Sequence, residues 1–359
     1  MRRTRRPVPM PARAGLATAA VAAAALGLAG CAGGEASAQG DGPQIVATTT
    51  QVGDFTRTLV GEQGEVTQLL QAGQSAHSFD PSAAQLRALA DADALVVNGA
   101  GLESWVEDAV EASGFDGVLV DASEGIELAA TEEHDHDHAG ADDATDEHEG
   151  ESAEEHAEHA DEHGHDHGAG NPHIWTDPAL AETMVENIAH GLAEVPGLDA
   201  DELEANEADY LAQLEALDAW IAENVEQVPV AERLLVTNHD AFTYFLDAYD
   251  ITFVGSVIPS FDDNAEPSAA EIDELVERIR STGVAAVFSE ASISPKAAET
   301  IAREADVTVY SGEDALYGDS LGVAGSEGET YIGSQLHNVR LILESWGVEP
   351  SAVPSALQG

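Results

Sequence analysis

Histidines and acidic residues are the side chains of this sequence whose types and spacing could do chemistry, and they are densest between residues 131 and 168. This segment holds nine histidines and sixteen acids, but no aromatic residue, lysine or arginine. Neutral imidazole nitrogens and carboxylate oxygens are ligands for divalent ions of intermediate softness such as zinc. The segment is therefore predicted to bind zinc weakly at auxiliary sites built from its histidines: His134, His136, His138, His148, His156, His159, His163, His165 and His167.

The same segment has almost no large apolar side chains. Such a stretch cannot bury enough surface to offset the entropy lost on ordering, so a disordered loop over 131–168 is predicted. A solvated acidic linker with incidental histidines is the alternative. Nine of the chain's fourteen histidines lie in this one segment, which favours metal binding.

The five other histidines divide into two groups. His190 lies in a helical stretch over 179–192 with no neighbour of ligand type, and His337 lies in another amphipathic helix over 331–343, so neither is assigned a metal role. The other three lie in loop-like stretches that follow strand candidates or precede a helix. Ligands of open α/β proteins bind outside the carboxyl ends of the strands, which makes these three the candidate site residues: His77, His173 and His239.

The elements that would position these histidines are eight short β-rich runs that alternate with helical ones. Four runs precede the midpoint of the chain and four follow it. This order predicts an α/β fold of two lobes, each with a four-stranded mainly parallel sheet flanked by helices. The strand candidates are 44–50, 66–70, 94–98, 117–120, 233–237, 251–257, 284–289 and 306–310.

Between the two groups of strands, apolar residues recur at three- and four-residue steps with acids between them. The pattern predicts one amphipathic helix over 199–228, roughly 40 Å long at 1.5 Å per residue. A single stiff helix of that length would join an N-terminal lobe over 44–198 to a C-terminal lobe over 229–347, followed by a tail over 348–359. The apolar positions are Leu203, Tyr210, Leu214, Leu217, Ile221 and Val225.

Three local signals mark helix starts. Asp177-Pro178 offers a side-chain acceptor at the N-cap and proline at the first helical position, and Ser294-Pro295 repeats the pattern. Ser268 and Glu271 form a predicted capping box. These acids and hydroxyls are interpreted as caps rather than as catalytic groups.

The first thirty residues read as a secretory signal. Five arginines precede an apolar alanine- and leucine-rich run, which ends in Leu28-Ala-Gly-Cys31. This resembles the bacterial lipobox, whose cleavage would leave a lipid-modified Cys31 followed by a tether over 31–43. A transmembrane anchor is disfavoured because the apolar run is short for a span. The chain is therefore expected outside the cytoplasm, anchored by lipid to the outer face of the cell membrane or periplasmic.

Charge and cysteine content exclude several classes. Cys31 is the only cysteine, so disulfides and thiolate metal sites are both excluded. No acid and five basic residues precede Cys31, so the mature chain would carry 68 acids against 8 bases, a net charge near −60. Nucleic acid is not an expected partner, because phosphate binding needs clustered lysine and arginine.

Six motifs together resemble the zinc/manganese solute-binding proteins of ATP-binding-cassette (ABC) importers, in the same order and over essentially 44–347. Three of them surround the candidate histidines, and the others lie elsewhere in the chain. The motifs are QSAHSFDP at 74–81, NGAGLESW at 98–105, NPHIW at 171–175, VTNHDAF at 236–242, FSEASISPK at 288–296 and YGDSLG at 317–322. The resemblance implies two α/β lobes joined by one long helix, with a metal in the cleft between them.

Carried over position by position, the resemblance implies that His77 and His173 of the first lobe and His239 and Asp319 of the second are the metal ligands. Members similar to manganese carriers have a carboxylate where this chain has His239. Some zinc members have an acid just before the first histidine, where this chain has Ala76, so Asp319 or a water would be the fourth ligand. Three imidazoles and one carboxylate suit Zn(II) better than manganese or magnesium.

The function implied is that of a monomeric, membrane-anchored receptor. It would capture Zn(II) as a transported ligand, not as a catalytic cofactor, and hand it to the membrane permease of an ABC importer. The histidine-rich loop would collect ions near the cleft, or act as a sensor that closes it. A manganese or iron receptor, or a surface metal buffer or adhesin, are the alternatives.

An enzyme is the remaining alternative. Gly318-Asp-Ser-Leu-Gly322 fits the G-x-S-x-G nucleophile pattern, so a hydrolase would use Ser320, an acid at Glu327 or Glu329, and His337. The three would lie within about twenty residues, whereas triad partners normally come from distant loops. No catalysis is therefore expected.

Overall fold

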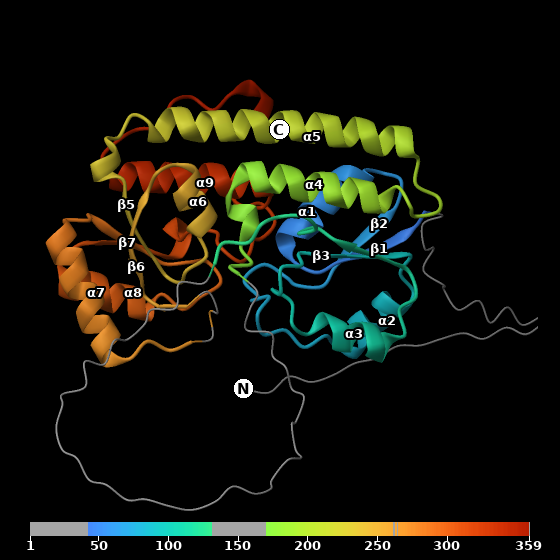
Figure 1. Cartoon of the computed structure of the whole chain (residues 1–359), viewed down its shortest axis with the longest axis horizontal. Coiled ribbons are helices and arrows are strands. Elements are labelled where there is room, and N and C mark those ends of the chain that lie inside the picture. The colour runs from blue at the N-terminus through green and yellow to red at the C-terminus, as the bar shows by residue number, and fades with distance from the viewer. Residues whose placement is uncertain (1–41, 131–169, 261–262, 264, 359) are drawn as a thin grey trace, which may run out of the picture. The chain divides into compact units, whose positions relative to one another are not determined.

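Short parallel strands and amphipathic helices alternate along the chain, as the hydrophobic pattern predicts (Figure 1). The computed structural model describes residues 42–130, 170–260, 263 and 265–358. Four predictions fall outside these ranges: the signal peptide over 1–30, the lipid-modified Cys31, most of the tether and the loop over 131–168 with its nine histidines. No described helix is long and apolar enough to cross a bilayer.

The strands are β1 (Gln44–Ala47), β2 (Glu65–Gln68), β3 (Ala94–Val97), β4 (Val118–Asp121), β5 (Leu234–Thr237), β6 (Thr252–Ser256), β7 (Ala286–Phe288) and β8 (Thr308–Tyr310). The α-helices are α1 (Thr50–Val60), α2 (Ala83–Ala90), α3 (Val106–Ser113), α4 (Pro178–Leu192), α5 (Ala200–Val225), α6 (Thr243–Ala248), α7 (Ala269–Thr282), α8 (Lys296–Ala305) and α9 (Tyr331–Ser345). Short 3-10 turns occur at η1 (Ile174–Thr176), η2 (Val230–Glu232), η3 (Gly312–Asp314) and η4 (Ser355–Leu357).

The first half of the chain, residues 42–198, contains one parallel sheet in the order β2-β1-β3-β4. All four residues of β3 are buried, as expected for a central parallel strand covered on both faces. Helices α1 and α4 pack on one face, and α2 and α3 lie on the other (Figure 1). This confirms the α/β fold class and the predicted sheet of this half.

The second half, residues 229–358, has the four predicted strands in two parallel pairs, β5-β6 and β7-β8, with β5 beside β7. Each strand begins and ends within three residues of its predicted bounds. The register of β5 on β6 shifts between Leu235 and Val236, and β7 and β8 are only three residues long. Helices α7 and α8 cover this layer and bury Leu275, Ile279 and Ile301 against it.

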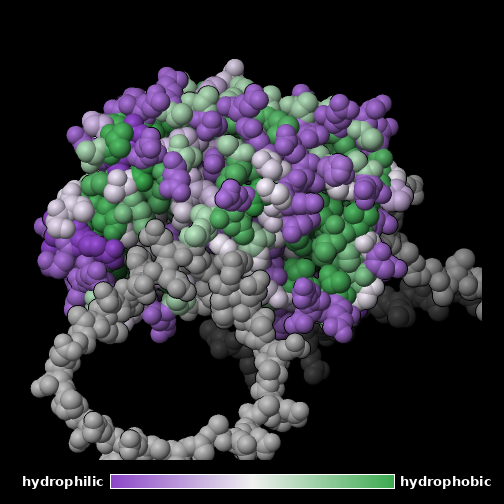
Figure 2. All heavy atoms as spheres, in the orientation of Figure 1, coloured by the Kyte–Doolittle hydropathy of each residue, from purple (hydrophilic) through white to green (hydrophobic). Residues whose placement is uncertain are grey.

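Helix α5 confirms the predicted amphipathic helix. The Asp199 side chain caps its N-terminus, and all six predicted apolar positions are buried, together with Trp220 and Asn224. It packs on α1 and α4 of the first half and on α9 of the second. Figure 2 shows hydrophilic side chains over the outer surface of α5 and of α7, consistent with one apolar stripe per helix. The lobe boundaries given above stay a prediction.

Two of the three predicted helix starts are confirmed. Asp177 accepts a hydrogen bond from the N–H of Ala179 ahead of Pro178, and Ser268 with Glu271 forms the capping box. The third is wrong, because α8 begins at Lys296 with Pro295 as an N-cap that offers no side-chain bond. The helix therefore starts one residue later than predicted, after a turn in which the N–H of Ile293 donates to the carbonyl of Glu290.

Candidate metal centre

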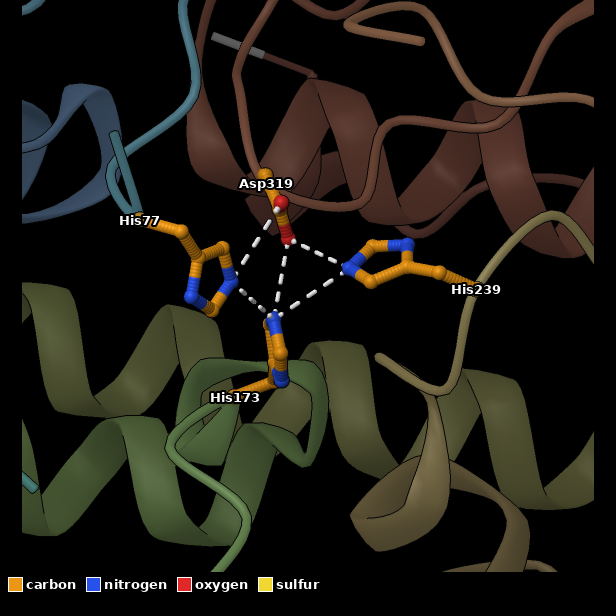
Figure 3. A group of neighbouring side chains, drawn as sticks. All are labelled: His77, His173, His239 and Asp319. Carbon is orange, nitrogen blue, oxygen red and sulfur yellow. Dashed lines mark hydrogen bonds and ion pairs between the residues drawn. The ribbon is translucent and has the colours of Figure 1, made fainter. Parts of the chain in front are cut away.

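Three histidines and one aspartate from four separate loops converge on one point (Figure 3). His77 follows β2, His173 precedes η1, His239 follows β5, and Asp319 lies in the loop between η3 and α9. One ligand-type atom of each lies within 4.8 Å of those of all the others. These are the four residues that the family resemblance implied.

The Nε2 atoms of the three imidazoles face the carboxylate and one another. His173 Nε2 lies 3.2 Å from His77 Nε2 and 3.4 Å from His239 Nε2. Asp319 Oδ1 lies 3.1 Å from His173 Nε2 and 3.2 Å from His239 Nε2, and Oδ2 lies 3.7 Å from His77 Nε2. A tetrahedral zinc ion with bonds of 2.0–2.1 Å separates its ligand atoms by about 3.3 Å. Four of these five distances lie within about 0.2 Å of that value, and the fifth, between His77 Nε2 and Asp319 Oδ2, is longer at 3.7 Å.

The imidazole of His173 is fully buried and held from behind by Asn171. Asn171 Oδ1 accepts from the Nδ1–H of His173 at 2.7 Å and from its backbone N–H at 3.1 Å. The Nδ2 of Asn171 donates to the carbonyl of Asp240 and to Thr243 Oγ1, both at 3.0 Å, which identifies the oxygen of this amide. The proton on Nδ1 leaves the Nε2 lone pair directed at the centre.

His239 is buried to the same degree, and its Nδ1 lies 2.7 Å from Glu290 Oε1. The same carboxylate oxygen accepts from the backbone N–H of His239 at 3.0 Å. Glu290 is the second residue after β7 and is only 1% exposed. Its carboxylate therefore fixes which imidazole nitrogen of His239 faces Asp319.

The loop that carries Asp319 is anchored on the first half of the chain. The carbonyl of Gly318 accepts from Gln51 Nε2 at 3.0 Å and from the indole N–H of Trp175 at 3.2 Å. The N–H of Leu321 donates to Thr50 Oγ1 at 2.8 Å. These bonds bring a carboxylate of the second half against the histidines of the first.

His77 is the only one of the four that is not fully buried. Its loop is held by the indole N–H of Trp105, which donates to the carbonyl of Ala76 at 2.9 Å. The ring of Trp105 packs edge-on against Phe79. The side of the centre nearest to His77 is therefore the most accessible to an ion.

Burial and charge act in opposite directions on the pKa values of the centre. Burial lowers the pKa of His173 to about 4, although the neighbouring Asp319 opposes it. Burial would also lower the pKa of His239, but the carboxylates of Asp319 and Glu290 outweigh it and hold that pKa well above its usual value. Burial would raise the pKa of Asp319, but the imidazoles of His239 and His173 hold it well below its usual range. These shifts favour a protonated His239 beside an ionised Asp319.

Of the residues given no metal role, His190 is exposed on α4. His337 is buried, with Nδ1 3.1 Å from Glu327 Oε2 and Nε2 3.0 Å from the carbonyl of Ala315. Ser320 Oγ donates to the carbonyl of Leu321 and accepts from the N–H of Gly73. The hydrolase hypothesis requires Ser320 to contact His337, and among the described contacts the two do not meet, although His337 does contact Glu327.

Sequence reasoning missed Asn171 and Glu290, the two residues that orient the imidazoles. Two sequence signals could have found them. Asn171 stands two residues before His173, and Glu290 lies two residues after the end of a buried strand, where functional residues of parallel sheets gather. Nothing in the sequence shows that Glu290 meets a histidine 51 residues earlier.

Residues 45–345 match the family model ZnuA, described as zinc-uptake complex component A, periplasmic. The chain belongs to this family. Proteins of this family are the metal-binding components of metal-uptake systems and work outside the cytoplasm. Relatives of this chain are named for different metals.

The manganese-binding lipoprotein MntA of Halalkalibacterium halodurans is 29% identical over 303 residues, which are 84% of this chain and 88% of that protein. The zinc-binding protein AdcA of Streptococcus pyogenes serotype M3 is 32% identical over 311 residues, 85% of this chain. The chain spans only 57% of the length of AdcA. Relatives named for zinc and for manganese are thus about equally similar.

Solved structures agree on the fold. The periplasmic zinc-binding protein TroA from Treponema pallidum superposes with a TM-score of 0.71 at 23% identity, over 85% of this chain and 99% of that one. A manganese-bound periplasmic metal-binding protein from Candidatus Liberibacter asiaticus gives 0.67 at 19% identity, over 84% and 99%. Because the sequence identities are low, these structures support the fold of this chain but do not indicate which metal it binds.

Proposed function

We propose that this chain is the zinc receptor of an ABC importer: it captures Zn(II) between His77, His173, His239 and Asp319 and delivers it to the membrane permease. The observation that carries the proposal is the convergence of the three imidazole Nε2 atoms on one buried carboxylate. The ion is cargo, so no catalytic group is needed beside it.

The hydrogen bonds behind the imidazoles argue for a cation in the centre. The Nδ1 of His173 donates to Asn171, and its pKa of about 4 makes this imidazole neutral near pH 7. Its Nε2 lone pair therefore faces Asp319 Oδ1 at 3.1 Å. Two acceptors at that distance repel each other unless a cation lies between them. A divalent ion bonded to both would turn this repulsion into attraction.

Zinc is favoured over manganese by the donor set. Three nitrogens and one oxygen make a four-coordinate set, the number that zinc usually takes, whereas manganese prefers more ligands and more oxygen. The spacing close to 3.3 Å fits a tetrahedron of zinc bonds. The manganese-named relatives make a manganese receptor the competing hypothesis.

The rest of the proposal concerns the way this receptor would work. A lipid on Cys31 would hold a monomeric receptor at the outer face of the membrane. The histidine-rich segment over 131–168 would collect ions at low affinity near the centre. The accessible side at His77 would be the route by which the ion is captured and released.

Metal analysis of protein purified without added metal tests the proposal, followed by competition between zinc and manganese for the metal-free protein. We expect one equivalent of tightly bound zinc and displacement of manganese by zinc. Tight binding of manganese that equimolar zinc does not displace would support the competing receptor. Absence of any tight divalent site would refute both.

A further inference from the structure

Two of the buried imidazoles are held by matching pairs of hydrogen bonds that differ in charge. One oxygen of Asn171 accepts from the Nδ1–H and backbone N–H of His173 at 2.7 and 3.1 Å. One oxygen of Glu290 accepts from the same two groups of His239 at 2.7 and 3.0 Å. The first acceptor is a neutral amide and the second is a carboxylate.

The second oxygen of Glu290 is in an unusual position. Oε2 is buried and makes no hydrogen bond within the described part of the chain. It lies against the backbone of Gly318, where an added Cβ would be 2.1 Å from it. A carboxylate in such surroundings is costly unless a nearby positive charge compensates for it.

No lysine or arginine forms an ion pair with Glu290 or Asp319 among the described residues, and their charged partners are the histidines. Burial raises the pKa of Glu290, and when both buried carboxylates are ionised they carry two negative charges beside three imidazoles. A bound dication would balance both. A bound ion would therefore explain why a carboxylate is buried at Glu290. The carboxylate would affect the ion indirectly, through its hydrogen bond to the imidazole of His239.

From this geometry we propose that Glu290 is a positioning and specificity-determining residue of the metal centre. Its carboxylate holds His239 with Nε2 directed inward and increases the electron density of that imidazole, which strengthens the nitrogen–metal bond. Zinc gains more than manganese, because manganese depends less on nitrogen ligands. The inference rests on the proposed function and adds to it a residue that does not touch the ion.

Two substitutions separate charge from orientation. Glu290→Gln keeps an oxygen that can accept both hydrogen bonds, as Asn171 does, and removes the charge. Glu290→Ala removes charge and orientation together. We expect zinc affinity to fall about tenfold in the first variant and about a hundredfold in the second. The loss of manganese affinity is expected to be smaller in both, so the zinc-to-manganese ratio falls.

Asp54→Asn is the matched control, because Asp54 is also a largely buried carboxylate that accepts a backbone hydrogen bond, from Tyr331 at 2.8 Å. It should leave both affinities within about twofold, whatever it does to stability. The visible absorption spectrum of the Co(II)-loaded proteins adds a second measurement. It reports the coordination of the ion, which would not change if Glu290 contributed only to protein stability. We expect the intense four-coordinate bands in wild type and in Glu290→Gln, and weaker bands in Glu290→Ala.

If a folded Glu290→Ala variant keeps the wild-type zinc and manganese affinities and their ratio, the inference about Glu290 is wrong, but the proposed zinc-receptor function still stands. An equal loss of zinc and manganese affinity in both variants would overturn the specificity role. If wild-type protein binds no divalent ion tightly, the proposed function itself fails. Circular dichroism of each variant shows whether it is folded.

Discussion

The indole N–H of Trp175 donates to the carbonyl oxygen of Gly318 at 3.2 Å, across 143 residues of sequence. Trp175 stands two residues after His173, and Gly318 directly precedes Asp319. One hydrogen bond thus joins the segments of two proposed ligands from opposite halves of the chain, and Gln51 bonds the same carbonyl oxygen. These bonds hold Asp319 beside the histidines of the first half, which is why small displacements of this backbone should weaken metal binding.

Replacing Gly318 with alanine tests that dependence. The new Cβ would meet Glu290 Oε2 at 2.1 Å, and Glu290 is buried and held by His239, so the backbone beside Asp319 must move. We expect zinc affinity to fall by about 10- to 100-fold and the protein to lose about 1–3 kcal/mol of stability. Calorimetric titration and thermal unfolding measure the two effects.

Gly53→Ala is the control for Gly318→Ala. The three heavy atoms nearest to its Cβ would all belong to the flexible side chain of Gln68, and alanine favours helix α1. Zinc affinity should stay at the wild-type value. Equal zinc affinity in the Gly318 and Gly53 variants would show that the approach of Gly318 to Glu290 has no bearing on the site.

Removing one imidazole tests the ligand assignment directly. His239→Ala leaves three donors, and Asp319 Oδ1 loses a partner that now lies 3.2 Å away. We expect zinc binding to weaken by orders of magnitude, as measured by competition with a chelator of known affinity. His190→Ala is the matched control, because His190 is exposed on α4. An unchanged dissociation constant for His239→Ala would refute the assignment.

Zinc binding should depend on pH through His239. Asp319 and Glu290 hold the pKa of this imidazole well above 6.5, so an incoming ion must displace its proton. Below that pKa, apparent affinity falls about tenfold per unit of pH. His173, whose pKa is about 4, contributes nothing to the change above pH 5. We expect zinc capture to weaken steadily from pH 7.5 to 5, and a flat titration over this range would contradict the mechanism.

The same pKa shifts act on the stability of the metal-free protein. The raised pKa of His239 contributes stability that is complete below its unfolded value of 6.5 and is lost as pH rises through the folded pKa. The depressed pKa of Asp319 contributes stability present above 3.8 and lost as pH falls through its folded pKa. The gap in unfolding temperature between zinc-loaded and metal-free protein should therefore widen as pH rises from 5 to 7.5.

Much of the fold could be predicted because its signals are local. The apolar residues of α5, from Leu203 to Val225, recur at helical spacing, and all of them are buried. The start of α8 could not be placed to the residue, because Ser294-Pro295 gives the same local signal as Asp177-Pro178 although no side-chain bond caps α8. The division of the last four strands into the pairs β5-β6 and β7-β8 rests on contacts between residues far apart in the sequence, which no local pattern encodes.

Some residues of the candidate metal centre could also be identified from the sequence, and others could not. His77, His173 and His239 could be singled out because loop histidines near strand ends are few. Asp319 came only from the family resemblance, because this chain has 68 acids and one more in a loop is unremarkable. Glu290 was missed for the same reason, since its role depends on a contact with a histidine 51 residues away.

Deleting residues 131–168 tests the role assigned to the histidine-rich segment. The chain leaves and rejoins the fold at one place, because the N–H of Asn171 donates to the carbonyl of Ala129 at 2.9 Å. The N–H of Ala129 in turn donates to Tyr244 Oη at 3.0 Å. A short glycine-serine link can therefore close the gap without moving Asn171, which holds His173 in place.

The shortened protein should keep one tight zinc site with wild-type affinity and lose the weaker sites, as measured by calorimetric titration beyond one equivalent. A variant with the nine histidines of the segment changed to serine is the control, because it keeps length and acidity while removing imidazole. If the serine variant retains the weak sites, the acids bind the extra ions and the histidines do not. Loss of the tight site in either variant would mean that a residue of the segment belongs to the centre itself.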